Sequence, residues 1–298
     1  MKRGLSGVLL VVLLAPYASA QGQADCTQRA REITDQLALT GAVAQPTGPL
    51  LIAFDRAVQG VAACPSDEAL WYLFLRTGEL GSGTYPVTLG GTEASDLQSA
   101  ALLARQRFPH SSRIATVLAR LSGSVEAARQ AVSADPAYPP ARVALGAALL
   151  KAGDAQGACQ ILDATSDLNR IPGAYTLLAR ARLAAADAQG AIDAAALEPK
   201  RVVNSIEPGG NRNLDAREAT EVEGLGYVAS GRFDKGACLL LRAAAQGSSS
   251  ARGALENPGP DLQHSLARVE RGCHLTATER SFLAELQKQW GKRPAERD

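Results

Sequence analysis

The sequence contains few aromatic residues and few histidines. Aromatic residues make up 4% of the 298 residues, and there are three histidines and one methionine. No H-E-x-x-H, C-x-x-C or Walker-type glycine-rich motif occurs, and no histidine has a partner at metal-ligand spacing. We therefore predict that the protein is not an enzyme and has no metal site and no cofactor. An enzyme whose site these motifs do not reveal is the alternative.

An excess of charge of one sign and long apolar runs are lacking as well. Lysine and arginine number 31 and aspartate and glutamate 30, which gives a formal net charge of +1. A chain without a strong positive field is not drawn to nucleic acid or to anionic lipid. The apolar run from Val8 to Ala15 is shorter than the roughly 20 residues that span a bilayer, and no later stretch comes close. We predict no nucleic-acid partner and no membrane insertion.

The first residues have the pattern of a secretory signal peptide. Lys2 and Arg3 precede the apolar run, and Ala18-Ser19-Ala20 forms a small-residue cleavage site. Residues 1–20 are therefore predicted to be removed after Ala20. The mature protein would begin at Gln21 and reside in the periplasm or outside the cell.

Alanine is abundant, whereas the alternation of β-branched residues that marks strands is missing. Alanine is the best helix former, so the sequence predicts an all-α fold. Residues 139–163 illustrate the pattern: Leu145 and Leu149 suit one face of a first helix, and Ala158 and Leu162 suit one face of a second. Such a hairpin buries its apolar stripe only by packing against neighbours.

The hairpin pattern recurs along the chain. Its anchor positions are separated by 44, 27 and 33 residues and are Phe74, Leu118, Leu145 and Leu178. The clearest motifs are Leu145-Gly146-x2-Leu149 with Ala158-x3-Leu162, Trp71-x2-Phe74-Leu75, and Glu223-Gly224-x2-Tyr227 with Gly236-x3-Leu240. In these motifs the chain resembles the tetratricopeptide repeat family, whose unit is about 34 residues long.

The resemblance implies helix-turn-helix repeats stacked as a right-handed α-solenoid with a concave face and a C-terminal capping helix. A compact helical bundle is the alternative. The expected parts are a repeat array in 21–199, a linker or inserted loop in 200–213, a further repeat in 214–247, capping helices in 261–290 and a disordered tail in 291–298.

Two stretches rich in glycine, serine and proline are predicted to be loops or connections, residues 81–91 and residues 247–261. A helix is expected from Asp261 to about Gly272. After it, Thr276-x-x-Glu279 is a capping box that opens the last helix.

Export makes the five cysteines informative, because an oxidising compartment permits disulfides. In antiparallel helices the start of one lies beside the end of the next. Cys26 would start the first helix and Cys64 would end the second, so we predict that they pair. Cys238 with Cys273 follows by the same argument. Cys159 is then left over as a small buried apolar residue.

The side chains two positions after each anchor would point toward the open side of the stack. These positions hold Arg76, Arg120 and Arg180, a basic row suited to carboxylates or phosphates. The candidate concave-face residues, counting those two positions before the anchors, are Tyr72, Arg76, Thr116, Arg120, Val143, Thr176 and Arg180. The alternative is that these are ordinary helix residues, some of them paired with nearby acids.

Together these observations predict an exported, non-enzymatic scaffold. Its concave face would bind a peptide, a protein or an anionic envelope polymer. A structural or accessory subunit of a cell-envelope assembly is the alternative function.

Overall fold

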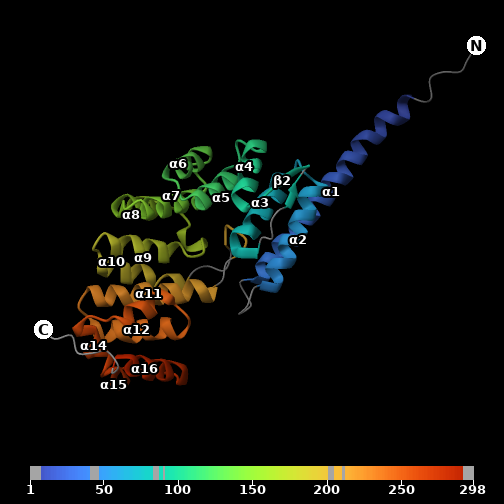
Figure 1. Ribbon diagram of the computed structural model, residues 1–298. Coiled ribbons are helices and arrows are strands. Elements are labelled where there is room, and N and C mark those ends of the chain that lie inside the picture. The colour runs from blue at the N-terminus through green and yellow to red at the C-terminus, as the bar shows by residue number, and fades with distance from the viewer. Residues whose placement is uncertain are drawn as a thin grey trace, which may run out of the picture. The chain divides into compact units, whose positions relative to one another are not determined.

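A computed structural model of the chain describes residues 8–40, 47–82, 87–89, 91–200, 205–209 and 212–290. The chain divides into two compact units, the first comprising Met1–Ser122 with Pro208–Gly210 and the second Gly123–Glu207 with Asn211–Asp298. Helices dominate both units (Figure 1). The predicted all-α class is therefore confirmed.

The first unit contains five α-helices among its described residues, together with a π-helical turn and a β-hairpin. The elements are α1 (Val8–Thr40), α2 (Thr47–Ala63), α3 (Glu68–Thr77), η1 (Gly78–Ser82), β1 (Val87–Leu89), β2 (Thr92–Ala94), α4 (Leu97–Arg107) and α5 (Ser112–Ser122). The hairpin pairs Val87 with Ala94 and Leu89 with Thr92. Strand β1 lies inside the stretch that we predicted to be a loop, and β2 directly follows that stretch. Leu89 and Ala94 are buried, which explains why this stretch forms strands in place of an open loop.

Several aromatic residues pack against one another in the core of the first unit. Phe54 of α2 lies 5.4 Å from Phe74 of α3, and Trp71 lies 6.4 Å from Phe108, both measured between ring centroids. The indole nitrogen of Trp71 donates to the carbonyl oxygen of Pro65 at 2.9 Å. Large side chains thus supply the apolar area that alanine-rich helices lack.

Helix α1 is longer than expected, because it begins at Val8 and not near Cys26. It passes through the predicted cleavage site at Ala20, in a stretch rich in good helix formers. Residues 1–7 of the predicted signal peptide lie outside the described residues. None of the described helices combines the length and apolar character needed to cross a membrane.

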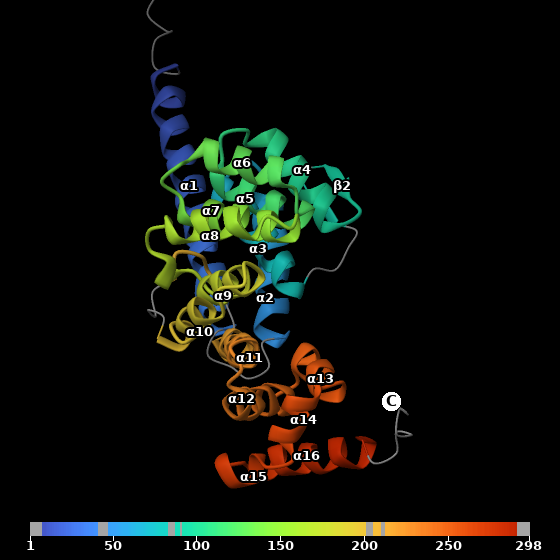
Figure 2. The ribbon, with the colours of Figure 1, turned by 90° about the vertical axis from the view of Figure 1, so that its left-hand side faces the viewer.

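The second unit is a succession of helix pairs. Its longer elements are α6 (Val125–Ala134), α7 (Pro139–Lys151), α8 (Ala155–Asp163), α9 (Ala174–Ala184), α10 (Ala188–Ala195), α11 (Arg212–Ala229) and α12 (Phe233–Ala245). Each of these helices contacts the next one along the chain, and α9 also contacts α7 and α11. Within this unit the pairs lie in successive layers (Figure 2).

The turns inside these pairs share one backbone design. Gly153, Ala186, Gly231 and Gly247 each adopt a positive φ, between 64° and 93°. After α7, the amide of Gly153 donates to Leu150 O and that of Asp154 to Leu149 O, which is a Schellman C-cap. The same two hydrogen bonds close α9, α11 and α12. Asp154 then caps the following helix through its side chain.

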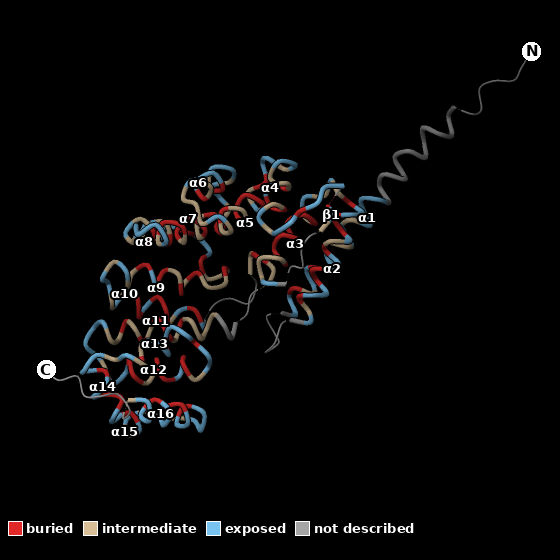
Figure 3. The backbone as a smooth tube through the Cα atoms, viewed as in Figure 1, coloured by how far each residue is buried: buried red, intermediate tan, exposed pale blue. Residues whose placement is uncertain are grey.

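Close approach of paired helices depends on glycine. A methyl group on Gly146 of α7 would lie 2.8 Å from the side chain of Leu162 in α8, which is too short for a carbon–carbon contact. Gly224 of α11 meets Leu240 of α12 in a similar way. These are the glycines of the expected repeat motifs. Buried residues accordingly lie where the helices face one another (Figure 3).

The predicted connection in 200–213 is described only in part. Residues 201–204, 210 and 211 lie outside the described residues, and residues 205–209 form no helix. A short 3-10 turn, η3 (Glu198–Lys200), precedes them, and α11 begins at Arg212, slightly earlier than expected.

The C-terminal part contains four helices where the sequence predicted two. The elements are α13 (Ser249–Glu256), α14 (Pro260–Leu266), α15 (Val269–Gly272) and α16 (Ala277–Trp290). Helix α13 occupies the expected connection, because Ser248 caps it and Ala251 and Leu255 are buried. The helix expected from Asp261 is split into α14 and α15. The capping box of α16 is confirmed, and residues 291–298 lie outside the described residues.

Candidate functional site

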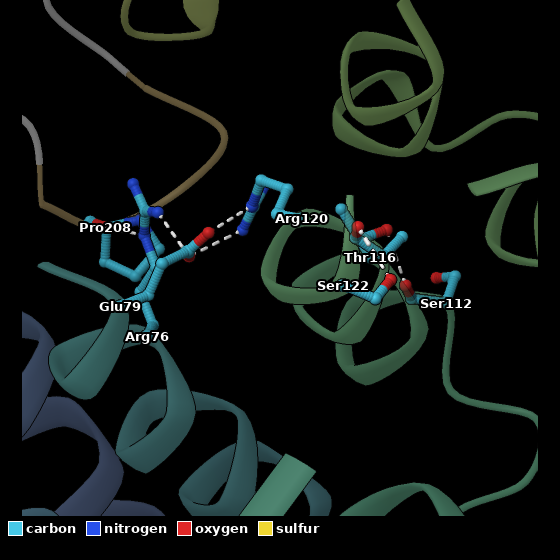
Figure 4. A network of polar contacts seen from close by, with 8 residues as sticks. Arg76, Glu79, Ser112, Thr116, Arg120, Ser122 and Pro208 are labelled. Atoms are coloured by element: carbon cyan, nitrogen blue, oxygen red, sulfur yellow. Dashed lines mark hydrogen bonds and ion pairs between the residues drawn. The ribbon is translucent and has the colours of Figure 1, made fainter. Parts of the chain in front are cut away.

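Two of the predicted concave-face arginines form an ion-pair network in the first unit (Figure 4). Glu79 lies between Arg76 of α3 and Arg120 of α5. Arg76 Nη1 donates to Glu79 Oε2 at 2.7 Å, and Arg120 Nη2 donates to the same oxygen at 2.9 Å. Arg76 Nε also donates to the carbonyl oxygen of Pro208 at 3.1 Å. These arginines therefore already have protein partners.

The turn η1 places Glu79 where it can reach both arginines. It continues α3 as a π-helical turn, a wider form that often marks functional or strained positions. Side-chain exposure is 10% for Arg76, 14% for Glu79 and 21% for Arg120. Burial by itself raises the pKa of Glu79, but the charges of Arg120 and Arg76 outweigh it and hold the pKa below its ordinary value of 4.5. The carboxylate is thus ionised at neutral pH.

The other predicted residues of the first unit are buried. Tyr72 faces Arg113, whose guanidinium lies 5.7 Å from the ring centroid. Thr116 Oγ1 donates to the carbonyl of Ser112 at 2.7 Å inside α5. Because their side chains are enclosed, Tyr72 and Thr116 cannot belong to an exposed binding surface.

In the second unit the row is represented by Val143, Thr176 and Arg180. Val143 is half-buried and Thr176 is buried. Arg180 is exposed, but its Nη2 lies 3.4 Å from Glu218 Oε2. The alternative interpretation, arginines paired with nearby acids, therefore describes all three. An open row of unpaired arginines is not what the structure contains.

Both predicted cysteine pairs lie at disulfide distance. The Cα atoms of Cys26 and Cys64 are 6.1 Å apart, and those of Cys238 and Cys273 are 6.0 Å apart. Cys159 is free and half-buried. Burial raises the pKa of its thiol, and the negative charge of Asp163 adds to this effect. The thiol is therefore a weak nucleophile.

Within the described part of the chain, no group of three or more histidine, cysteine, aspartate or glutamate side chains is arranged to hold a metal ion.

A cleft that we did not predict lies in the second unit. It has a volume of about 290 Å³ and is formed by α8, α9, α10 and the residues that follow α8 and α10. Its lining combines apolar and charged side chains: Leu162, Asp163, Thr165, Leu168, Tyr175, Leu178, Arg182, Asp193, Ala194 and Leu197.

The charged groups of the cleft are held by short contacts. Arg182 Nη2 donates to Asp163 Oδ1 at 2.8 Å, and Arg182 Nη1 donates to the carbonyl of Gly190 at 3.1 Å. Asp193 Oδ1 accepts from Gln189 Nε2 at 2.8 Å. Leu197 is 41% exposed, an unusual position for a large apolar side chain in this protein.

Sequence reasoning missed this cleft because its residues come from three helices and the turns between them. Leu162 and Leu178 were assigned to helix packing, and Leu197 lies in a turn after α10, where helical periodicity assigns no face. The sequence carried no helix-face signal for it, because Asp193 lies within α10 whereas Leu197 lies beyond its last residue. Comparison of the whole sequence with protein-family models and with curated proteins finds no match.

Proposed function

We propose that this protein is an exported, non-enzymatic scaffold of the tetratricopeptide-like type that binds a peptide or a segment of a protein. The cleft of the second unit is the observation that carries this proposal. Ligand sites are typically concave and mostly apolar, with a few convergent polar groups, and the cleft has this composition.

The repeat architecture is supported by the packing inside the second unit. Successive helices contact one another, and the Schellman turns repeat. Glycines at Gly146 and Gly224 allow close helix contact, as the family's motif requires. A right-handed solenoid is the arrangement that we propose for these pairs, because it buries each pair's apolar stripe against the next.

Export is supported by the leader pattern and by the cysteine pairs at disulfide distance. Disulfides persist in oxidising compartments, which include the periplasm and the cell exterior. Intact-mass analysis of native protein should give a chain that starts at Gln21. A mass that includes Met1 to Ala20 would contradict export by this route.

The partner that we favour is a peptide or protein, and not an anionic envelope polymer. A negatively charged polymer would need arginines whose guanidinium groups are available for binding. Arg76 and Arg120 both form ion pairs with Glu79. A structural subunit of an envelope assembly is the second candidate function. It is favoured by three exposed apolar side chains on α1 and α2 of the first unit, Leu39, Leu51 and Ile52.

A capture experiment tests the binding function. Immobilised mature protein is incubated with cell-envelope extract, and retained proteins are cross-linked and identified by mass spectrometry. The control is the same protein after reduction, alkylation and unfolding. We expect at least one protein retained by the folded form alone, with cross-links to the second unit. Equal recovery on the unfolded control would contradict a specific binding function.

A further inference from the structure

The walls of the cleft in the second unit are aliphatic. Leu162 and Leu168 lie at the end of α8 and beyond it, Leu178 lies on α9, and Leu197 follows α10. Leu162 is fully buried, whereas Leu197 is partly open to solvent. The cleft therefore presents an apolar floor with an exposed apolar side chain at its rim.

The positive charge in the cleft is already neutralised. Arg182 donates to the carboxylate of Asp163 and to the carbonyl of Gly190. Two of the five N–H donors of the guanidinium are thereby used, and Asp163 balances its charge.

The remaining charged group in the lining is Asp193. Its carboxylate is exposed and accepts one hydrogen bond from Gln189, and it makes no ion pair with any residue within the described ranges. Asp193 lies near the end of α10 and Leu197 two residues beyond that helix, and both line the cleft, so the carboxylate belongs to the same lining as the apolar rim. The lining thus carries one surplus negative charge beside an apolar surface.

We propose that the cleft binds a peptide segment in which an aliphatic side chain enters the apolar floor while an adjacent lysine or arginine pairs with Asp193. The cleft, at about 290 Å³, is at the lower end of the range for ligand sites, a size that suits one or two side chains. This inference rests on the proposed binding function and assigns its partner chemistry. The charge is opposite to the acidic partner that the arginine row suggested.

Selection from a library of random linear peptides tests the proposal on the full mature protein. We expect enriched peptides to combine an aliphatic residue with a neighbouring lysine or arginine. The enriched peptide is then fluorescently labelled, and its dissociation constant is measured by anisotropy with wild-type protein and with variants.

Two variants probe the two halves of the site. Asp193→Lys reverses the charge at the rim, and Leu197→Ser removes exposed apolar surface. Each should weaken binding about tenfold, which corresponds to about 1.4 kcal/mol. Asp193→Lys should also prefer a version of the peptide in which the basic residue is replaced by glutamate, because the sign of the pairing is exchanged.

Matched controls lie outside the cleft. Glu126→Lys makes the same charge change on an exposed acid of α6, which is likewise hydrogen-bonded to a glutamine four residues away. Leu102→Ser removes a comparably exposed leucine from α4. Both controls should bind the peptide as the wild type does, and circular dichroism melts should show that all four variants remain folded.

The possible outcomes separate the two proposals. Peptides that bind wild type and Asp193→Lys equally, or that lack the basic residue, overturn the cleft inference and leave the binding function standing. Failure of both the library and the envelope extract to give any binder overturns both. Loss of affinity in the cleft variants alone, with the exchanged charge preference, supports the inference.

Discussion

Glu79 and Arg120, 41 residues apart in the chain, form a two-point ion pair in the first unit. Arg76 adds a third contact to the same carboxylate. The pair connects the turn after α3 to the end of α5, and its side chains are largely enclosed. Arg76 and Arg120, which the sequence suggested as part of a binding surface, therefore form a structural contact.

Replacement of Glu79 by glutamine should therefore destabilise the protein. Two guanidinium groups would lose their counter-charge while staying partly buried. We expect a loss of about 2 kcal/mol in the free energy of unfolding, less than the roughly 3–5 kcal/mol of a fully buried pair because some solvent reaches these side chains. Urea denaturation measures the loss. Asp25→Asn, which breaks an exposed ion pair with Arg29, should cost about 0.3 kcal/mol.

Glu79 should also make stability depend on pH. Its folded-state pKa lies below the ordinary value, so its contribution is complete above the unfolded-state pKa of about 4.5 and is lost as pH falls through the folded-state pKa. Wild-type stability should therefore drop more steeply below that pH than the stability of Glu79→Gln. Urea midpoints across an acid series test this, and parallel curves would contradict it. Glu279 should contribute equally to both proteins, since hydrogen bonds from Thr276 outweigh the effect of burial and lower its pKa as well.

The repeated turn predicts opposite effects for two single-methyl changes. Ala186 occupies a positive-φ position that glycine fills in the related turns. Ala186→Gly should raise the free energy of unfolding by about 1 kcal/mol, because it relieves the left-handed conformation of a side-chain-bearing residue. Gly153→Ala, in a turn where space around the new methyl is open, should lower it by about 1 kcal/mol. Changes of the same sign in chemical denaturation would contradict the shared turn design.

Helix contact predicts a steric effect at Gly146. Gly146→Ala places a methyl group against the buried Leu162, which must shift. We expect a cost of about 1–3 kcal/mol from overpacking. The control is Gly253→Ala in α13, where nothing lies within 4 Å of the added methyl, and it should stabilise the protein by up to about 1 kcal/mol. A gain at Gly146 equal to that at Gly253 would show that α7 and α8 do not touch at this point.

Disulfide formation predicts both a peptide map and a stability change. Non-reducing digestion of exported protein should link Cys26 to Cys64 and Cys238 to Cys273. The double replacement of Cys26 and Cys64 by serine should cost about 4 kcal/mol in the chain-entropy model, since these cysteines are 38 residues apart. Cys159→Ser should leave the map unchanged. A linkage to Cys159 would contradict the helix order.

The helical class and the ends of several helices could be predicted from the sequence, because they depend on neighbours within one or two turns. The capping box at Thr276 and Glu279 is such a local signal. The cysteine pairs were also predicted, although the helix ends assumed for them differ from those observed. Cys26 lies inside α1, and three helices separate Cys238 from Cys273. Helix α13 was not predicted, because its polar surface residues obscure the apolar pattern formed by the buried Ala251 and Leu255.

The environment of the predicted arginines was decided by tertiary structure alone. Helical phase predicts that Arg76 and Arg120 occupy equivalent helix positions, but phase says nothing about an acid contributed by a turn, and Glu79 forms ion pairs with both guanidinium groups. The cleft is a tertiary property for the same reason. The residues that line it come from separate helices. The sequence does not distinguish an apolar residue such as Leu162 that packs against another helix from one that borders an open space. Local periodicity fixes which face of a helix is apolar, whereas the packing of whole helices decides where that face is left uncovered.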